Sequence, residues 1–301
     1  MMSTPELSVV LCTHNPRADY LRRTLDSIAA QTLDRALWEF VVIDNASSPA
    51  LDADGPPQRR VVREETPGLV HARLRGIRET TGALLVFVDD DNVLAPDYLA
   101  RALAVSRDWP QLGTWGGQTI AEFEVEPREE LRPYLWLAIR EFAHDRWTNV
   151  PFTPDAMPYG AGLCARRAVA ERYAQLLRDD PVRTKFGRNG NHLAGSEDTD
   201  LVLTGYDSGF GSGVFAGLKL THLIDKCRLD EDYLLRLVEA TTYSITLLRC
   251  LRGMPPPGPS RVQRLLRWYE FLHVSALTRR FEQARMRGER SAVADAKALR
   301  P

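Results

Sequence analysis

Short apolar runs that alternate with helical segments are the feature that most restricts the fold of this chain. Residues 7–12 (LSVVLC), 38–44 (WEFVVID) and 83–88 (ALLVFV) are mostly apolar and rich in valine. Such runs are typical of strands that are buried on both faces. Residues 21–29 and 68–80 have helical spacing, and residues 59–65 (RRVVREE) indicate a shorter strand nearer an edge. Strands joined by helices predict an α/β fold around a parallel sheet with right-handed crossovers.

Acidic residues follow two of these predicted strands. Ligands collect beyond the carboxyl ends of parallel strands, so Thr13, Asp44 and residues 89–91 (DDD) are expected on one rim of the sheet. An aspartate after a strand often only starts a turn, and this alternative holds equally for Asp44. Three consecutive carboxylates repel one another unless a cation, a donor or a proton offsets their charge. The run therefore favours a site for a hard divalent cation.

Composition excludes several classes of protein. The chain has 301 residues, 44% of them hydrophobic, so it can bury a large core and carry a second lobe. Its formal net charge of -1 argues against a general nucleic-acid binder. The four cysteines form no C-x-x-C pair, which indicates neither a zinc site nor a disulfide framework. Without a signal peptide or an apolar run of about 18 residues, we expect a cytoplasmic protein.

Three stretches in the first third of the chain form an ordered series of motifs. They are SVVLCTHNPRADYLRRTLDSIAAQT, FVVIDNASS and GLVHARLRGIRETTGALLVFVDDDNVLAPDYL. The series resembles the signatures of the family 2 inverting glycosyltransferases with the GT-A fold, and the resemblance covers residues 7–224. It implies a central, mostly parallel sheet flanked by helices. It also implies an enzyme that moves a sugar from a nucleotide diphosphate to an acceptor hydroxyl.

The resemblance implies roles for individual residues. The donor nucleotide would be held by Thr13, Asn15, Asp44, Arg73, Asp89 and Asp90. A divalent cation, Mn²⁺ or Mg²⁺, would be bound by Asp91 and Asp89, with His222 as a further ligand. Taken alone, a histidine after a strand is more often structural, and Arg73 is more often a solvated charge on a helix.

The sequence departs from the family pattern at two positions. Leu74 stands where asparagine is usual, and Pro16 comes before Arg17 in the first loop. Neither position does chemistry, but both bear on the contacts to the base and the phosphates. Base contacts through Thr13 and Asp44 favour a sugar linked to UDP or dTDP over one linked to GDP.

The segment EDTD at residues 197–200 supports two interpretations. Ser196 suits an N-cap, and the helix dipole favours acids in the first turn of a helix. A similar motif holds the general base of the family, so the resemblance implies that Asp198 takes the proton from the acceptor hydroxyl. Glu197 and Asp200 would then orient this base or contact the acceptor. Such a base must lie within hydrogen-bond reach of the attacking oxygen.

Small residues mark the expected acceptor side. Residues 113–120 (GTWGGQTI) and 159–169 (YGAGLCARRAV) combine glycines with an adjoining strand or helix. The glycines let a backbone approach a ligand closely, or equally allow a tight turn. The second stretch resembles a loop of the family near the sugar and the acceptor, and Trp115, Gly160 and Gly162 are the candidates for binding them. Residues 181–195 lack periodicity and suit either a lid that orders with the donor or an ordinary loop.

We expect a catalytic domain over residues 1–228 and a helical region over residues 229–301. Residues 1–112 would bind the nucleotide and residues 113–228 the acceptor. Residues 233–251 have helical spacing, PPPGP at 255–259 breaks it, and residues 261–290 resume it as another helix. That helix has eight arginines against three glutamates. It suits contact with an anionic membrane surface, or packing on the core or on the second subunit of a homodimer.

Two rival functions use the same residues. The stretch FVDDDNV also fits a D-x-D-x-[TV] phosphatase signature, in which the first aspartate is a nucleophile. That chemistry usually places the motif on the first strand and needs a lysine further on. The other rival is a catalytically silent nucleotide-sugar-binding module, against which the presence of both Asp91 and Asp198 speaks. The expected partners are a nucleotide-diphosphate sugar and a glycan, lipid-linked or small-molecule hydroxyl acceptor, with no nucleic acid.

Overall fold

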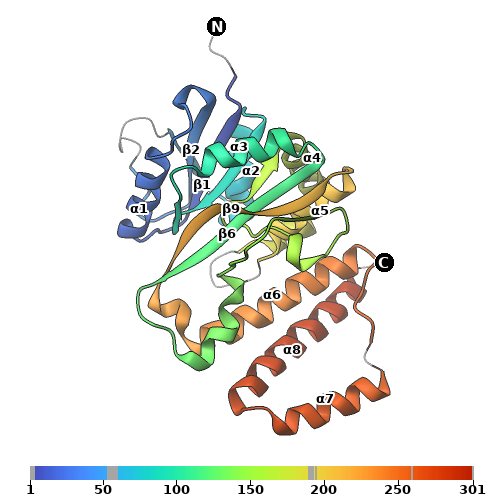
Figure 1. Ribbon diagram of the computed structural model, residues 1–301. Coiled ribbons are helices and arrows are strands. Elements are labelled where there is room, and N and C mark those ends of the chain that lie inside the picture. Colours follow the sequence, from blue (N-terminus) through green and yellow to red (C-terminus); the bar gives the residue numbers. More distant parts are fainter. Residues whose placement is uncertain (1–3, 53–59, 189–192, 194, 259, 300–301) are drawn as a thin grey trace.

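The computed structural model describes residues 4–52, 60–188, 193, 195–258 and 260–299. Its strands form a sheet through the centre of the molecule, with helices on both faces (Figure 1). The strands are β1 (Leu7–Thr13), β2 (Trp38–Asn45), β3 (Arg60–Glu64), β4 (Leu84–Asp89), β5 (Asn92–Leu94), β6 (Leu112–Phe123), β7 (Arg146–Thr148), β8 (Cys164–Arg166) and β9 (Gly211–Ile224). Their order is β3-β2-β1-β4-β8-β6-β9-β5, with β7 paired to β9.

The first four strands pair in parallel, as the sequence predicted, and β3 lies at the edge. Side chains along β1 alternate between two cores, Val9 and Leu11 on one face and Val10 and Cys12 on the other. This alternation follows from the pleat of a strand and explains the continuous apolar run. Asp44 is the register partner of Thr13, and Cys12 is that of Asp89. The expected rim of polar residues is thus confirmed.

Beyond β4 the sheet is mixed. β8 pairs antiparallel with both β4 and β6, whereas β6 and β9 pair in parallel over most of their length. β5 and β7 both run antiparallel to β9. The sheet is therefore parallel in the half that carries the acid run and mixed in the half that faces the C-terminal helices.

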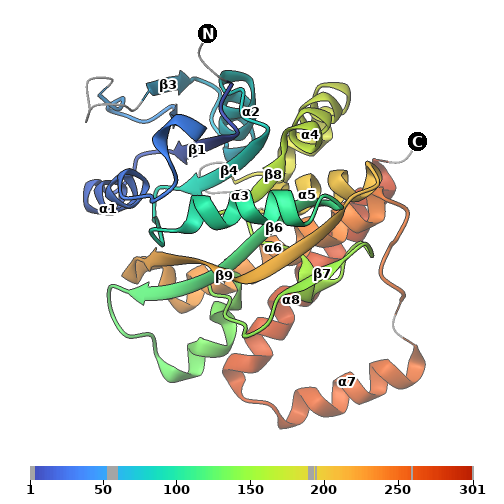
Figure 2. The ribbon, with the colours of Figure 1, turned by 45° about the horizontal axis from the view of Figure 1, so that its top comes forward.

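Helices cover the two faces of the sheet (Figures 1 and 2). α1 (Ala18–Ala29) and α3 (Tyr98–Asp108) pack into one core, while α2 (Leu69–Glu79), α4 (Arg167–Asp179) and α5 (Glu197–Asp207) pack into the other. Short 3₁₀ helices are η1 (Arg35–Leu37), η2 (Glu129–Leu137), η3 (Pro154–Ala156), η4 (Pro181–Phe186) and η5 (Lys226–Leu229). η4 occupies the start of the segment predicted as a lid or loop, whose residues 189–192 and 194 lie outside the described residues.

Three helices follow the sheet: α6 (Glu231–Leu251), α7 (Arg261–His273) and α8 (Ala276–Ala298). The prediction of one helix over residues 261–290 was wrong, because α7 ends at His273 and Ser275 caps α8 by accepting from the backbone N–H of Thr278. α8 packs along α6, and Phe281 of α8 stacks on Tyr134 of η2 with ring centroids 3.5 Å apart. Figure 2 shows α7 at the bottom, away from the sheet.

Arginines of α8 form ion pairs with carboxylates of the same chain. Arg280 pairs with Glu231 and Asp232 of α6, and Arg287 pairs with Glu239, so these arginines are neutralised where they lie. α7 instead exposes a stripe of apolar side chains at helical spacing, namely Val262, Leu265, Leu266 and Tyr269. None of the described helices is both long enough and apolar enough to cross a membrane.

Candidate functional site

A cavity of about 410 Å³ opens where β1 and β4 end, beside the first turn of α5. It joins segments that are far apart in the sequence. The predicted site residues that line it are Thr13, Arg73, Asp89, Asp90, Asp91, Gly160, Glu197, Asp198 and His222. The parallel pairing of the first strands, and the pairing of β9 with β5 directly after the acid run, bring these residues together.

The acid run crowds three carboxylates at the end of β4. Burial, reinforced by repulsion from Asp91, raises the pKa of Asp90 to about 7, although Thr13 donates its hydroxyl to this carboxylate. Burial also raises the pKa of Asp89, against the attraction of Arg73. Raised carboxyl pKa values mean that the ionised forms are unfavourable here without added positive charge. The cluster is therefore prepared to receive a cation or a cationic group.

Asp91 already has two positively polarised neighbours. Its Oδ2 lies 2.9 Å from Nη1 of Arg228 and 3.4 Å from Nε2 of His222. Burial alone would raise the pKa of Asp91, but His222 and Arg228 outweigh it and hold the pKa well below its usual range. Asp91 is thus ionised in the pocket, with its negative charge directed at β9 and η5.

When the His222 ring is neutral, its hydrogen bonds leave the Nε2 lone pair facing the pocket. Nδ1 is 2.9 Å from the carbonyl oxygen of Ala138, so in the neutral ring Nδ1 carries the proton. Nε2 then accepts from Arg228 at 3.0 Å. A carbonyl that fixes the tautomer in this way is the usual support of a metal-binding histidine. His222 lies within β9 rather than after it, opposite Asn92 of β5.

These two residues fit a divalent cation, although the predicted set of three ligands is not assembled. Two ligands at about 2.1 Å from one cation, at roughly a right angle, stand about 3 Å apart, close to the observed separation of Asp91 and His222. Asp89 instead lies 4.0 Å from Arg73. Among the described residues, no group of three or more His, Cys, Asp or Glu side chains has metal-binding geometry. The guanidinium of Arg228 lies where such a cation would be held.

Arg73 is the central cation of the other half of the site. It is 3% exposed, and its Nη1 lies 3.5 Å from Glu197, while its Nη2 donates to the carbonyl of Gly160 over 3.4 Å. Among the described residues, its Nε and Nη1 have no hydrogen-bond acceptor. Buried guanidinium groups are normally satisfied, so these donors indicate room for an anionic ligand. The reading of Arg73 as a solvated helix charge is wrong, because α2 turns this side chain towards the sheet.

Two carboxylates of α5 face the cavity in different environments. Asp198 Oδ1 accepts from the backbone N–H of Thr199 at 2.6 Å, which holds the side chain in place. Its Oδ2 lies 3.1 Å from the position that a β-carbon on Gly160 would take. Glu197 is buried, and this burial, with repulsion from Asp198, raises its pKa to about 7 against the attraction of Arg73. Ser196 precedes the helix as predicted, but its hydroxyl makes no capping bond.

Asp200 does not reach the cavity. Its side chain is fully buried and forms ion pairs with Arg183 at 3.2 Å and Arg252 at 3.5 Å. The prediction that it contacts the acceptor is therefore corrected. Although Asp200 stands only three residues after Glu197 on α5, only Glu197 and Asp198 line the cavity, and Asp200 points at the arginines of η4 and of the end of α6. There it joins α5 to η4 and to the end of α6.

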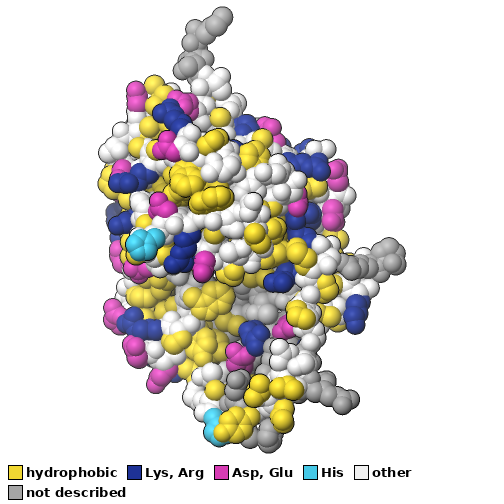
Figure 3. All heavy atoms as spheres, turned by 45° about the vertical axis from the view of Figure 1, so that its right-hand side comes forward, with side chains coloured by type: hydrophobic (Ala, Val, Ile, Leu, Met, Phe, Trp, Pro, Cys, Tyr) yellow, Lys and Arg dark blue, Asp and Glu magenta, His cyan; other side chains and the backbone are white. Residues whose placement is uncertain are grey.

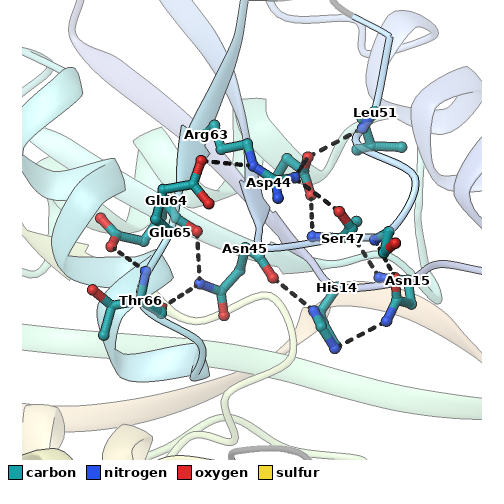
Figure 4. Close-up of polar contacts among 11 residues, drawn as sticks. His14, Asn15, Asp44, Asn45, Ser47, Leu51, Arg63, Glu64, Glu65 and Thr66 are labelled. Carbon is teal, nitrogen blue, oxygen red and sulfur yellow. Dashed lines mark hydrogen bonds and ion pairs between the residues drawn. The ribbon is translucent and has the colours of Figure 1, made fainter.

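Asp44 and Asn15 also lie outside the cavity, in a hydrogen-bond network beyond β1 and β2 (Figure 4). The Asp44 carboxylate accepts from the backbone N–H groups of Ser47 and Leu51, both at 3.1 Å, and from Arg63 at 2.8 Å. The side-chain oxygen of Asn15 accepts from the backbone N–H of Ser48, and the backbone N–H of Asn15 donates to the Ser47 hydroxyl. Both residues stabilise the loop after β2. In this conformation, Asp44 therefore has the role of a turn residue, which was the alternative to a ligand contact.

Trp115 and Gly162 are further corrections. Trp115 is 0% exposed and packs in the core under α3, so its ring has no surface for an acceptor. Gly162 has φ +68 and accepts from the Tyr98 hydroxyl through its carbonyl, which makes it a turn between the cavity and β8. Gly160 does line the cavity, where a β-carbon would approach Arg73 to 2.9 Å.

Sequence reasoning missed Arg228 and the wall formed by η2 and α6. Arg228 stands alone in the sequence, six residues after His222, and no motif surrounds it. A weak signal was available, because a basic residue shortly after a predicted metal ligand can reach the same anion. The wall residues look like ordinary helix positions, and only the packing of α6 under β6 and β9 reveals them.

Comparison with known proteins identifies the family. The sequence profile described as "Glycosyl transferase family 2" matches residues 8–163. The chain belongs to glycosyl transferase family 2. This membership favours the glycosyltransferase hypothesis over the phosphatase hypothesis. In addition, no lysine lines the described part of the cavity. An N-acetylglucosaminyltransferase of Sinorhizobium fredii is 29% identical over 68% of this chain and 50% of its own length. A glucosyl-dolichyl phosphate glucuronosyltransferase of Haloferax volcanii is 22% identical over 76% of this chain and 72% of its own length.

Solved structures establish the fold of this family 2 glycosyltransferase. The mannosyltransferase PcManGT of Pyrobaculum calidifontis, in complex with GDP-Man and Mn²⁺, has a TM-score of 0.54, 19% identity, and coverage of 99% of this chain and 77% of that one. TarS 1–349 of S. aureus with UDP-GlcNAc has a TM-score of 0.52, 16% identity, and coverage of 80% and 66%. The fold is accordingly GT-A. The chain spans about half the length, or less, of most curated relatives it matches.

Proposed function

We propose that this family 2 glycosyltransferase is an inverting enzyme that transfers a sugar from a nucleotide diphosphate to an acceptor hydroxyl. The observation that carries the proposal is the position of Arg73. This buried guanidinium, with unpaired donors, lies between the acid run of β4 and the two acids of α5. An anionic donor bound to Arg73 would have a cation site on one side and Asp198 on the other. A displacement at an anomeric carbon requires this arrangement, with positive charge beside the leaving diphosphate and a base on the opposite side.

The donor would lie along the rim formed by residues 1–112. Arg73 would contact the diphosphate, while Asp89 and Asp90 would bind the ribose and diphosphate region with Thr13 beside them. Asp44 would reach the base only by exchanging its bond to Arg63 for one from the base. We propose UDP or dTDP rather than GDP as the nucleotide. The UDP-GlcNAc bound to TarS is a precedent for such a donor, whereas PcManGT was solved with GDP-Man.

A divalent cation, Mn²⁺ or Mg²⁺, would be held by Asp91 and His222, with Asp89 nearby. When bound it would neutralise the charge that develops on the departing diphosphate. Arg228 would have to leave its position between Asp91 and His222 to admit the cation. Since the guanidinium is 32% exposed, it can turn towards the pocket and add a second positive charge beside the diphosphate.

The proton step belongs to Asp198 in this proposal. The acceptor hydroxyl would sit between Asp198 and Gly160, in the half formed by residues 113–228, because a glycine there leaves room beside the carboxylate. Asp198 would take the hydroxyl proton as the oxygen attacks the anomeric carbon from the side opposite the diphosphate. Glu197 would hold Arg73 in place through their ion pair. An α-linked donor would give a β-linked product.

We further propose a role in the synthesis of polysaccharides or other glycoconjugates in the cytoplasm, at the inner face of the membrane. The surface that would contact a membrane or a second subunit is the apolar stripe of α7, because the arginines of α8 described above are paired. Co-sedimentation with anionic vesicles, with Leu265→Glu as the comparison, would test the membrane contact. Sedimentation of the protein alone would test the dimer.

A thermal-shift screen tests the donor proposal. UDP, dTDP and GDP, with and without Mn²⁺, are added to the wild type and to the Arg73→Met and Asp91→Asn variants. We expect a metal-dependent rise in melting temperature with UDP or dTDP, loss of nucleotide stabilisation in Arg73→Met, and loss of only its metal dependence in Asp91→Asn. The absence of any metal-dependent shift in the wild type would contradict the proposed donor site.

A further inference from the structure

The pocket has two halves with different chemistry. The half at the strand ends carries the charged groups described above. The other half is built by η2 and by one face of α6, and its side chains are almost all apolar. They are Tyr134, Leu135, Trp136, Leu137, Ala138, Tyr233, Leu234, Leu237, Thr241 and Ile245.

The contribution of α6 is a continuous stripe. Leu234, Leu237, Thr241 and Ile245 follow one another at intervals of three or four residues and therefore share one face of the helix. At 1.5 Å per residue, the stripe runs for about 16 Å along the pocket. α8 does not cover it, because α8 packs on the side of α6 where Gly288 touches the backbone of Glu239. Thr241 carries the only hydroxyl on the stripe.

The apolar half continues to the proposed base. Trp136 lies at its open end and is 51% exposed. The carbonyl of Trp136 accepts from the Tyr159 hydroxyl at 2.9 Å, and Tyr159 precedes Gly160, which adjoins Asp198. On the face drawn in Figure 3, hydrophobic side chains gather around a hollow at the height at which Figure 1 shows η2 and α6.

We infer that the apolar half of the pocket binds an alkyl chain that carries the acceptor hydroxyl. This inference rests on the proposed function, because it places the chain beside Asp198. A sugar acceptor in the same position would bring several hydroxyls against the α6 stripe, where Thr241 is the only side-chain partner. Hydroxyls that lose water without gaining a partner destabilise the complex. A linear aliphatic chain is long enough to lie along the α6 stripe and has the same apolar character as its side chains.

The test uses n-alkyl β-glucosides from methyl to octyl, kept below their micelle-forming concentrations. Binding is measured by titration calorimetry in the presence of UDP and Mn²⁺. Each methylene buried against the wall should tighten binding about threefold to fourfold. A gain that continues to the octyl chain indicates a lipid-borne acceptor, and a gain that stops after a few carbons indicates a small alcohol; both results support the inference.

Two variants locate the chain. Ile245→Ser, at a partly exposed position of the stripe, and Leu237→Ser, at a buried one, should each flatten the dependence on chain length. Val150→Ser, at an exposed position outside both the pocket and α7, is the matched control and should leave the dependence on chain length unchanged. Circular dichroism confirms that each variant is folded.

The outcomes separate this inference from the proposed function. Equal binding of methyl and octyl glucosides, or an unchanged chain-length dependence in both stripe variants, overturns the inference. UDP binding that depends on Mn²⁺, measured in the same titrations without glucoside, tests the donor site independently. A flat alkyl series with intact UDP binding therefore refutes only the acceptor assignment. An intact alkyl series without UDP binding refutes the donor assignment and leaves the apolar site standing.

Discussion

Replacing Asp198 with asparagine is the most direct test of the proposed mechanism. The variant retains the shape of the side chain and an oxygen that can accept from the backbone N–H of Thr199. It cannot accept the proton of an acceptor hydroxyl. Loss of a positioned general base typically slows catalysis a hundredfold to ten-thousandfold. This corresponds to roughly 3 to 5 kcal/mol of transition-state free energy.

The structure predicts that this loss falls on kcat alone. Asp198 lies on the acceptor side of Arg73 and makes no bond within the acid run of β4. The dissociation constant of the nucleotide should therefore stay within about threefold of the wild-type value, which is less than 1 kcal/mol. Release of the nucleoside diphosphate, followed at saturating donor and acceptor, gives kcat. Titration calorimetry with the nucleotide and Mn²⁺ gives the affinity.

Glu197→Gln is the matched control, because Glu197 is the neighbouring carboxylate in the same helical turn. Its kcat should fall less than about tenfold, since Glu197 supports Arg73 rather than the acceptor. The reasoning is refuted if Asp198→Asn keeps more than about a tenth of the wild-type kcat while Glu197→Gln loses more. Glu197 would then be the base, with a pKa of about 7 that suits such a role.

Three further predictions concern pH, folding and metal binding. Burial raises the pKa of Glu197 from 4.5 to about 7, so the folded state holds this proton more tightly than the unfolded chain does. The proton therefore stabilises the folded state at low pH, and this stabilisation is lost as the pH rises towards 7. The free energy of unfolding should fall by roughly 1 to 3 kcal/mol between about pH 5 and pH 7. Urea denaturation across this range should show a smaller fall for Glu197→Gln. Asp200→Ala should lower the free energy of unfolding by about 3 kcal/mol, because it removes the buried carboxylate that Arg183 and Arg252 share and leaves them only their exposed partners Asp180 and Asp207. A normal melting temperature with reduced kcat would restore the predicted acceptor role of Asp200. Arg228→Gln should increase Mn²⁺ affinity about tenfold in calorimetry without nucleotide, because a competing cation is removed from Asp91; weaker Mn²⁺ binding would show instead that Arg228 supports the metal.

Much of the N-terminal half was predictable because its signals are local. The apolar runs of β1, β2 and β4 are continuous because both faces of these strands are covered, and that pattern can be read from a few residues. Parallel strands with helical crossovers then place Thr13 and Asp89 on one rim without further information. The start of α5 after Ser196 was equally readable, although the expected capping bond is not made.

The choice among similar residues was not predictable. Asp198 and Asp200 are both acids in the first turn of α5, yet one lines the cavity and the other pairs with two arginines from η4 and the end of α6. Trp115 is a residue type that often stacks on ligands, but the helices that pack on β6 bury its ring completely. In each case the deciding neighbours are distant in the sequence, so no local pattern contains them.

The sequence by itself determined the order of the strands and helices up to β4, the polar rim and the membership of glycosyl transferase family 2, because periodicity and motifs lie within short segments. Only the tertiary structure decided which side chains share the pocket. Arg228 meets Asp91 because β9 returns beside β5, and the apolar stripe of α6 faces the pocket because α8 covers another side of the helix. These contacts depend on how distant segments pack, and packing is set by the whole chain at once.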